Sequence, residues 1–316
     1  MAAGFSWETK DILSRVAVKS RAQKIAELHA LIAGLGNLSV GEDGALGLVL
    51  QSENLPAVRR ADFLLRAVSG AAPDCSCFLS GRDKNTLYTV SLYHSEKLLP
   101  VLVACGFMNK QGALRDKEVP APPSLIRDEA CARAFLRGSF LAAGYVSDPR
   151  RSYHWEVICA GKARGEALMQ LIASLGISAR ATTRKGKALV YVKDGESIAA
   201  LLSLMGAYGS TLHWENARVL HSLQGQVNRQ VNCETANLAK ISRAGQEQAS
   251  VIRRLKESPC WNELPAPLKE IAAARLENPE ISLKELGEMM SPPVGKSGIN
   301  HRMRKIMQIA EYYGLA

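Results

Sequence analysis

Apolar and polar positions along the chain switch repeatedly between a helical period and a strand period, and these switches predict its elements. Residues 25–40, IAELHALIAGLGNLSV, carry apolar side chains at helical spacing and then turn into a short strand after Gly36. By the same criteria a hairpin, a helix, a second hairpin and a further helix follow, up to Cys105. The pattern therefore predicts the order helix, hairpin, helix, hairpin, helix.

The same order recurs after the proline-rich stretch Val119–Pro123. Residues 135–149, FLRGSFLAAGYVSDP, begin the second series with a helix that again ends in a glycine and a short strand. Leu136 lies 108 residues after Leu28, and this offset aligns the two leading helices. Matching order at a fixed offset indicates an internal repeat.

Small residues in the second leading helix predict how the two repeats meet. Gly138, Ala142 and Ala143 lack the long side chains that hold a neighbouring backbone away. The two leading helices are therefore expected to pack directly against each other. This arrangement predicts two repeats, residues 1–118 and 119–213, that fold as one unit.

Each repeat supplies four strands, which predicts one antiparallel sheet per repeat with helices on one face only. Cations gather in and beside turns of the second repeat, on or near the face of its sheet that is expected to point outward. They are Arg150, Arg151, Arg180, Arg184, Lys185 and Lys187. Since cations at turns are commonly solvated, they could equally be ordinary surface charges.

Residues 214–257 contain few turn signals and are predicted to form a helical connector of two helices. Their polar run, NRQVNCETAN, places Asn228 and Asn232 on one helical face. Amide side chains at that spacing could contact nucleic acid. We favour the interpretation that they cap the end of one helix and the start of the next.

Residues 258–316 are predicted to form three short helices. Pro265–Leu276 has apolar residues on one side, and Asn278 before Pro279 ends it. Ser282 and Glu285 form the pattern of a capping box at the start of the second helix. After a loop with two prolines, Ser297 is expected to cap the third helix.

The third helix separates apolar from polar side chains along its length. The residues expected to be buried are Ile299, Met303, Ile306, Ala310 and Tyr313. In a helix-turn-helix domain this helix would enter the major groove. The candidates for reading bases are Ser297, Asn300, His301 and Arg304, with Gln308 further along the same side. The candidates for phosphate contact are Lys296, Arg302 and Lys305. A protein-binding domain with a basic face is the alternative.

Composition narrows the class of partner. The 40 basic and 30 acidic residues give a formal net charge of +10, which favours a polyanion such as double-stranded DNA. No apolar run reaches the roughly 18 residues of a membrane span, and the N-terminus is unlike a secretory signal. The seven scattered cysteines are expected to be reduced in a cytoplasmic protein. We find no nucleotide-binding, hydrolase or metal-ligand pattern, and therefore predict no cofactor, metal or small-molecule substrate.

The two leading helices resemble the LAGLIDADG motif of homing endonucleases. The resemblance implies an α+β fold, a pseudo-twofold LAGLIDADG domain (αββαββα repeated) followed by an all-α helix-turn-helix domain. It also implies that the outward sheet faces form a saddle for DNA, so the six cations at the turns of the second repeat are candidates for a secondary contact with DNA. In that family each motif helix ends in an acidic residue that holds the catalytic metal. Here those positions are Leu35 and Ala143, which offer no oxygen ligand. The resemblance therefore implies the fold without the enzyme.

The whole chain resembles the WhiA family. The runs FLRGSFLAAGYVSDPRRSYHWE, NRQVNCETAN and LKELGEMMSPPVGKSGINHRMRKI carry this resemblance. It implies a cytoplasmic, nucleoid-associated protein that binds DNA sequence-specifically and regulates transcription. The implied role is in cell division and chromosome segregation, and in sporulation in some relatives.

Two alternatives remain open at the level of sequence. A protein-interaction scaffold on the nucleoid would use the LAGLIDADG fold to recruit a protein partner. An active homing-type endonuclease would need carboxylates at the ends of the motif helices. The nearest, Glu42 and Asp148, fall in predicted turns beyond those ends.

Overall fold

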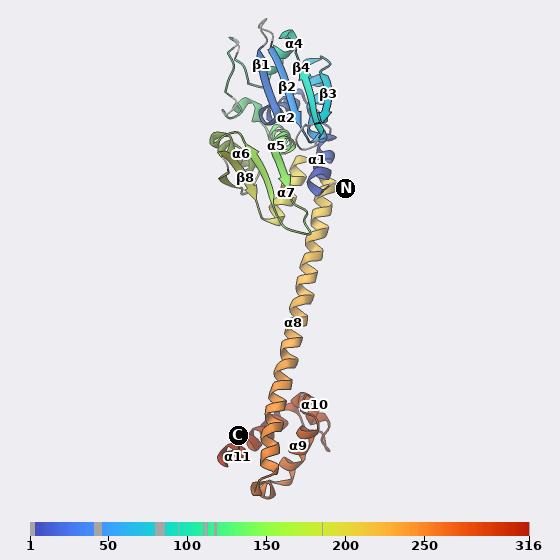
Figure 1. Cartoon of the computed structure of the whole chain (residues 1–316), viewed down its shortest axis with the longest axis vertical. Helices are drawn as coiled ribbons and strands as arrows, with labels where there is room; N and C mark the ends of the chain where they lie inside the picture. The colour runs from blue at the N-terminus through green and yellow to red at the C-terminus, as the bar shows by residue number, and fades with distance from the viewer. Residues whose placement is uncertain are drawn as a thin grey trace. The chain divides into compact units, whose positions relative to one another are not determined.

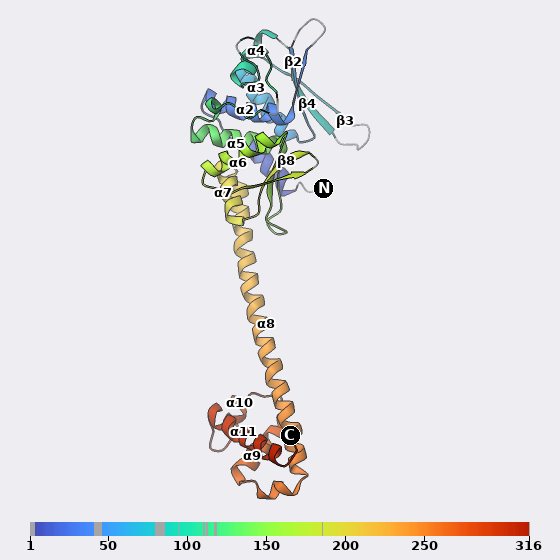
Figure 2. The same cartoon turned by 90° about the vertical axis from the view of Figure 1, so that its left-hand side faces the viewer.

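Two helices related by the 108-residue offset lie at the centre of the first part of the chain. α2 spans Arg21–Leu35 and α5 spans Glu129–Ala143, so the first and last residues of α5 lie 108 residues after those of α2, as predicted. The two helices pack against each other, and Figure 1 and Figure 2 show them side by side between the strands of two sheets. A Cβ on Gly138 would collide with the carbonyl oxygen of Glu27, which explains the need for glycine there.

The computed structural model describes residues 4–40, 46–79, 86–93, 95–109, 111, 113–116, 119–184 and 186–315. The chain divides into two units, Met1–His221 and Ser222–Ala316. Within the described residues, no helix is both long and apolar enough to cross a bilayer.

The first unit contains both repeats. The first repeat follows the short helix α1 (Phe5–Ser14) and consists of α2, β1 (Gly36–Val40), β2 (Leu46–Ser52), α3 (Leu55–Ser69), β3 (Asp74–Leu79), β4 (Thr86–Leu92) and α4 (Ser95–Ala104). A 3₁₀ turn, η1 (Pro123–Ile126), precedes the second repeat. The second repeat consists of α5, β5 (Gly144–Val146), β6 (Trp155–Cys159), α6 (Lys162–Ser174), β7 (Arg180–Arg184), β8 (Lys187–Val192) and α7 (Gly195–Met205).

Both sheets are antiparallel and have the same strand order, β1-β2-β4-β3 and β5-β6-β8-β7. The predicted alternation is clear in β5 and β6 but not in every strand, since all of β7 is exposed and three successive residues of β8 are buried. In β6, Trp155 and Val157 are buried against the helices, whereas Ile158 is 43% exposed on the other face. The predicted α+β class and the repeated LAGLIDADG-like topology are confirmed.

Local sequence explains where the central helices begin. Ser20 caps α2 by accepting a hydrogen bond from the Gln23 amide, and the Gln23 side chain completes the capping box. Asp128 caps α5 by accepting from the Cys131 amide. One hydrophobic core then joins the repeats, with Leu28 and Leu136 both fully buried in it.

The segment predicted as two connector helices is a single helix, so that prediction was wrong. α8 runs without interruption from Tyr208 to Lys256, and it crosses the boundary between the two units. Asn228 and Asn232 are exposed within it and cap nothing, which also corrects their interpretation as caps. Asparagine lowers helix propensity by only about 0.7 kcal/mol or less relative to alanine, so a polar run without proline does not end a helix.

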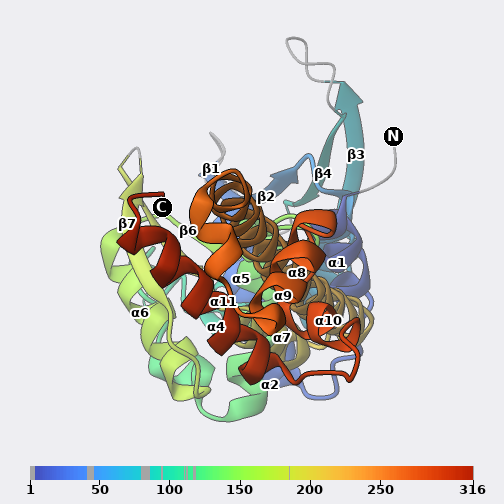
Figure 3. The ribbon, with the colours of Figure 1, turned by 90° about the horizontal axis from the view of Figure 1, so that it is seen from below.

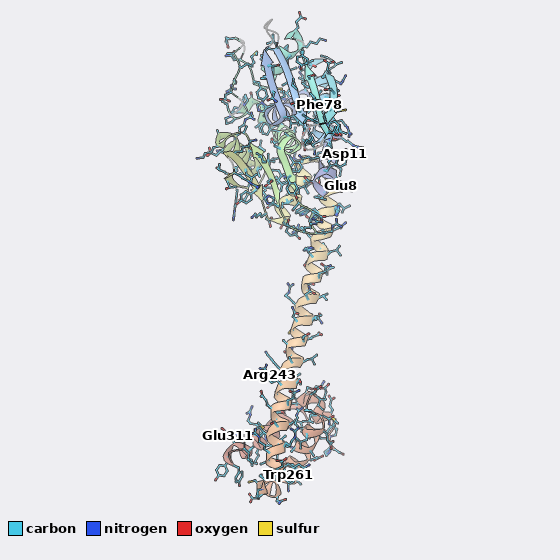
Figure 4. All side chains as sticks on the ribbon, viewed as in Figure 1. Glu8, Asp11, Phe78, Arg243, Trp261 and Glu311 are labelled. Atoms are coloured by element: carbon cyan, nitrogen blue, oxygen red, sulfur yellow. The ribbon has the colours of Figure 1, made fainter. Side chains whose placement is uncertain are left out.

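The second unit is built on the C-terminal end of α8. It adds η2 (Pro259–Glu263), α9 (Ala266–Glu277), α10 (Leu283–Glu288) and α11 (Lys296–Tyr312), which Figure 3 shows gathered there. Ile252 and Leu255 of α8 share a core with the three helices α9 to α11. Figure 4 shows Arg243 projecting from the surface of α8 and Trp261 in η2, which packs partly against this core.

Candidate nucleic-acid interface

The turn between α10 and α11 is held by short backbone contacts. Ser282 caps α10 and Glu285 returns to the Ser282 amide at 2.8 Å, so the predicted capping box is present. The amide of Val294 donates to the carbonyl of Gly287 at 2.9 Å. A Cβ on Gly287 would collide with the Val294 carbonyl, so the turn closes tightly only over a glycine. These contacts fix the direction in which α11 leaves the turn.

The start of α11 differs from the sequence prediction. Its N-cap is Gly295, in an extended conformation without a side-chain cap, and Ser297 lies inside the first turn. The prediction that Ser297 caps the helix was wrong, because the helical conformation begins at Lys296. The hydroxyl of Ser297 is consequently exposed on the first turn instead of being used by the backbone.

One face of α11 is buried and the opposite face is exposed. Ile299, Met303, Ile306 and Ala310 are buried as predicted, at no more than 1% exposure. Tyr313 is 44% exposed, so its predicted burial was wrong. The helix ends at Tyr312, and Tyr313 therefore leaves the apolar stripe and donates its hydroxyl to Glu263 at 3.3 Å.

The candidate readers all lie on the exposed side of α11. Ser297, Asn300, His301 and Arg304 are exposed, and so is Gln308 further along. Within the described parts of the chain, none of these five side chains has a hydrogen bond or ion pair to another residue of the protein. Their polar groups are therefore available to an external partner.

The candidate phosphate contacts lie on the same helix but differ in exposure. Lys296 and Lys305 are exposed, whereas Arg302 is half-buried. Lys305 and Gln308 also line a surface hollow of about 390 Å³ beside Tyr312 and Tyr313. The fold thus brings all eight predicted residues of α11 onto one short helix.

Cations of the second repeat lie on the outer face of its sheet. Arg184 pairs with Lys187 in the β7–β8 register, and Arg180 lies four residues earlier on the same face of β7. Both arginines and Lys187 are exposed. Lys185 lies outside the described residues. Whether these side chains contact DNA stays a prediction.

Arg150 and Arg151, in the turn that follows β5, have different contacts. Arg150 donates from Nε and Nη2 to the two carboxylate oxygens of Asp148, at 3.1 and 2.8 Å. These hydrogen bonds lower the pKa of Asp148 to about 2, and the carboxylate is thus committed to Arg150. Arg151 is exposed. Within the described residues, Arg150 is therefore hydrogen-bonded to Asp148 through its side chain, whereas Arg151 makes no such bond to it.

The ends of the motif helices carry no acid. Leu35 and Ala143 are the last residues of α2 and α5, and both are half-buried. Among the described residues, no three His, Cys, Asp or Glu side chains are grouped so that they could hold a metal ion. Glu42 lies outside the described residues.

The prediction from sequence also missed a charged side chain. Arg164 on α6 faces a cavity between the repeats, where five separate segments of the chain meet. Its spacing on α6 is that of an ordinary surface cation, so no local signal could have identified it.

Two family models match this chain. The model described as WhiA LAGLIDADG-like domain matches residues 132–224, and the model described as WhiA C-terminal HTH domain matches residues 227–310. The second match therefore begins inside α8 and includes α9, α10 and nearly all of α11.

Curated relatives match almost the whole chain. A protein named Probable cell division protein WhiA from Heliobacterium modesticaldum is 37% identical over 310 residues, covering 98% of this chain and 96% of the relative. A protein of the same name from Desulfitobacterium hafniense is 40% identical over 310 residues, covering 97% and 95%.

Solved structures show the same fold. The crystal structure of full-length DUF199/WhiA from Thermatoga maritima has a TM-score of 0.60 and 25% identity, covering 98% of this chain and 99% of that one. The N-terminal LAGLIDADG domain of DUF199/WhiA has a TM-score of 0.50 and 23% identity, covering 65% of this chain and 92% of that one.

Proposed function

Since the chain belongs to the WhiA family, we propose that it is a sequence-specific regulator that binds double-stranded DNA through α11. The relatives are named as probable cell division proteins, and we extend that role to this chain. We assign it to transcription connected with cell division and chromosome segregation, in the cytoplasm and on the nucleoid, and with sporulation where the host sporulates.

The observation that carries this proposal is the division of α11 into two faces. Ile299, Met303 and Ile306 fasten the helix to the core, so its orientation is fixed. Asn300 and Arg304 stand on the opposite side, four residues and one turn apart. Asparagine makes bidentate contacts with adenine and arginine with guanine in the major groove. Exposed cations beside them suit the flanking phosphates.

We further propose that the chain has no nuclease activity. Metal-dependent cleavage of DNA needs carboxylates that hold the ion next to the scissile phosphate. Leu35 and Ala143 occupy the helix ends where the resembled enzymes carry those acids. Asp148, the nearest described alternative, is engaged by Arg150. The test is incubation of supercoiled DNA with the purified chain and magnesium or manganese, where cleavage that survives repurification would contradict the proposal.

The DNA-binding proposal can be tested without knowing the target in advance. The full chain selects duplexes from a randomised pool, and fluorescence anisotropy then compares the enriched duplex with a scrambled one. The double variant Asn300→Ala, Arg304→Ala is expected to lose preference for the enriched duplex. Lys162→Ala is the matched control, because Lys162 is an exposed cation on α6 of the other unit.

The same comparison tests whether the outer sheet faces of the first unit, instead of α11, recognise the DNA sequence. If the α11 variant keeps its preference and Arg184→Ala, Lys187→Ala loses it, then the second repeat is the reader and the assignment to α11 is wrong. If the parent chain itself binds scrambled and enriched duplexes alike, the proposal of sequence-specific binding is wrong.

One observation favours a second candidate function, a protein-interaction scaffold on the nucleoid. Val227, Val231 and Leu238 of α8 are each more than half exposed and lie close to one line along the helix. Association with a protein through such side chains would resist salt, whereas binding through phosphates weakens steeply with salt. Salt titration of a co-purifying complex would distinguish the two functions.

A further inference from the structure

A cavity of about 170 Å³ lies where the two repeats meet, lined by α2, α5, β6 and α6 together with Pro120, Ala121, Ile126 and Lys187. Its walls are mainly small apolar side chains, among them Ala33, Ala142 and Ala167, and none of the described residues that line it is acidic. An engineered apolar cavity of about 150 Å³ is large enough to hold benzene. The cavity therefore has room for one ring or a short branched chain.

One half-buried cation, Arg164, lines this cavity. Arg164 donates from Nε to the Val119 carbonyl at 3.1 Å and from Nη2 to Nε2 of His29 at 3.4 Å. Both acceptors are uncharged. Within the described part of the chain, Nη1 of Arg164 has no hydrogen-bond partner. The guanidinium is thus held by two bonds and keeps one nitrogen for another acceptor.

His29 is fixed as a neutral acceptor for Arg164. Nδ1 lies 2.6 Å from the carbonyl oxygen of Cys105, which can only accept, so Nδ1 carries the proton and Nε2 is free to accept. Burial lowers the pKa of His29 to about 4, so the ring stays neutral at pH 7. The ring also stacks on Phe107 and Phe135. The acceptor that His29 offers to Arg164 is therefore held in a fixed position.

The surroundings of Arg164 leave its charge incompletely solvated. Burial lowers the pKa of Arg164, while Cys159 and Asp116 raise it. Arginine nevertheless remains protonated in proteins. A charge in a region of low dielectric interacts more strongly with an incoming anion than a charge in water does. Lys187, which also lines the cavity, adds a second positive charge.

We propose that this cavity binds a compact apolar monocarboxylate, with its apolar part among the alanines and its carboxylate on Arg164. The planar guanidinium fork matches the geometry of a carboxylate. The occupant would contact both motif helices and both repeats. The site is separate from α11, and its test does not depend on binding of DNA.

Benzoate is the probe, and the full chain is the protein. Binding is followed by ¹⁵N–¹H chemical-shift changes and by calorimetric titration. Benzyl alcohol has a similar shape without the charge and is expected to bind at least tenfold more weakly. Phenyl phosphate is expected to bind more weakly than benzoate, and tighter binding of phenyl phosphate would contradict a site for a carboxylate. Shift changes are expected at Ala142, Ala167 and the Arg164 side chain.

Two variants alter the cavity by different means. Ala167→Leu fills the space and keeps the charge, whereas Arg164→Met removes the charge and keeps much of the length. Each is expected to weaken benzoate binding at least tenfold. Lys162→Met is the matched control, because it removes an exposed cation from the same helix and is expected to bind benzoate like the parent.

Three outcomes would overturn the proposal. The first is the absence of saturable benzoate binding by the parent at millimolar concentrations. The second is equal binding of benzoate and benzyl alcohol, which would remove the role of Arg164. The third is unchanged binding by Ala167→Leu. Thermal unfolding of each variant separates lost binding from lost folding, and a folded Ala167→Leu suffices for the decision if Arg164→Met unfolds.

Discussion

Arg137 and Glu27 form a buried ion pair across the two motif helices, with Nη2 of Arg137 2.6 Å from Oε2 of Glu27. Arg137 lies on α5 and Glu27 on α2, 110 residues apart. Arg60 on α3 donates to the same carboxylate through Nε and Nη2, at 2.7 and 2.9 Å. Glu27 is 0% exposed, so one acid and two arginines join three helices inside the core.

Glu27→Ala is expected to destabilise the first unit strongly, because it leaves two buried arginines without their acid. Removing one partner of a buried ion pair costs about 3–5 kcal/mol. The measurement is calorimetric unfolding of the full chain, following the transition of the first unit. Asp11→Ala is the control, since Asp11 likewise pairs with two arginines, Arg15 and Arg59, but both are exposed and exposed pairs contribute about 0–1 kcal/mol each. Equal losses for the two variants would contradict a structural role of the buried triad.

Gly138→Ala is expected to lower the stability of the same unit by about 1–3 kcal/mol, the usual cost of overpacking. The added methyl would collide with the Glu27 carbonyl and lie 2.9 Å from the Ala30 Cβ, so α2 and α5 would have to separate. Gly209→Ala is the control. Its Cβ would lie 3.4 Å from Ile12, an ordinary contact, and alanine favours a helix over glycine. If Gly209→Ala lowers the stability and Gly138→Ala does not, the close contact of α2 and α5 at Gly138 is not what requires a glycine there.

Arg304 and Lys305 are expected to affect DNA binding in different ways. Arg304→Ala should cost about 1–3 kcal/mol on the enriched duplex and relax discrimination at one base position, preferentially a guanine. Lys305→Ala should weaken binding to the enriched and the scrambled duplex alike. It should also lower by about one the slope of the logarithm of the binding constant against the logarithm of the salt concentration. Anisotropy titrations at several salt concentrations measure both effects. Identical behaviour of the two variants would show that α11 does not divide its contacts in this way.

His29 is expected to make the first unit less stable as pH falls. Its pKa is about 4 in the folded state and about 6.5 when exposed, so the unfolded chain binds the proton first. The contribution of neutral His29 to the free energy of unfolding is fully present above about pH 6.5. It is lost progressively as the pH falls to about 4, and the total loss is about 3 kcal/mol. Long-range ¹⁵N spectra of the ring should show no protonation at pH 5.5. An ordinary titration near pH 6.5 would contradict burial of a neutral His29.

The middle of α8 is expected to exchange its amide hydrogens faster than α2 does. From Ser222 to Lys240 no described residue is buried, so nothing but the helix itself protects these amides. Most of the stability of helices in proteins comes from tertiary packing, which the amides of α2 have in the core and this stretch of α8 lacks. Hydrogen–deuterium exchange with peptide-level mass spectrometry measures the difference. Protection of residues 222–240 equal to that of α2 would indicate a partner on this helix.

The sequence determined the features that arise within a few residues. The 3.6- and 2-residue periods located the helices and strands, and the 108-residue offset identified the repeat whose two sheets have the same order. The Ser282–Glu285 capping box and the buried face of α11 followed from local spacing. These features depend on neighbouring residues, whose types the sequence states directly.

Only the tertiary structure decided which distant residues meet. Nothing near Glu27 indicates Arg60 or Arg137, because their contacts depend on the crossing of three helices. Arg164 has the spacing of a surface cation, and packing of the two repeats places it, half-buried, beside His29. α8 is continuous because its polar run contains no proline or glycine. Tyr313 is exposed because α11 ends at the residue before it. Local pattern fixes what an element is, whereas packing fixes what each of its side chains touches.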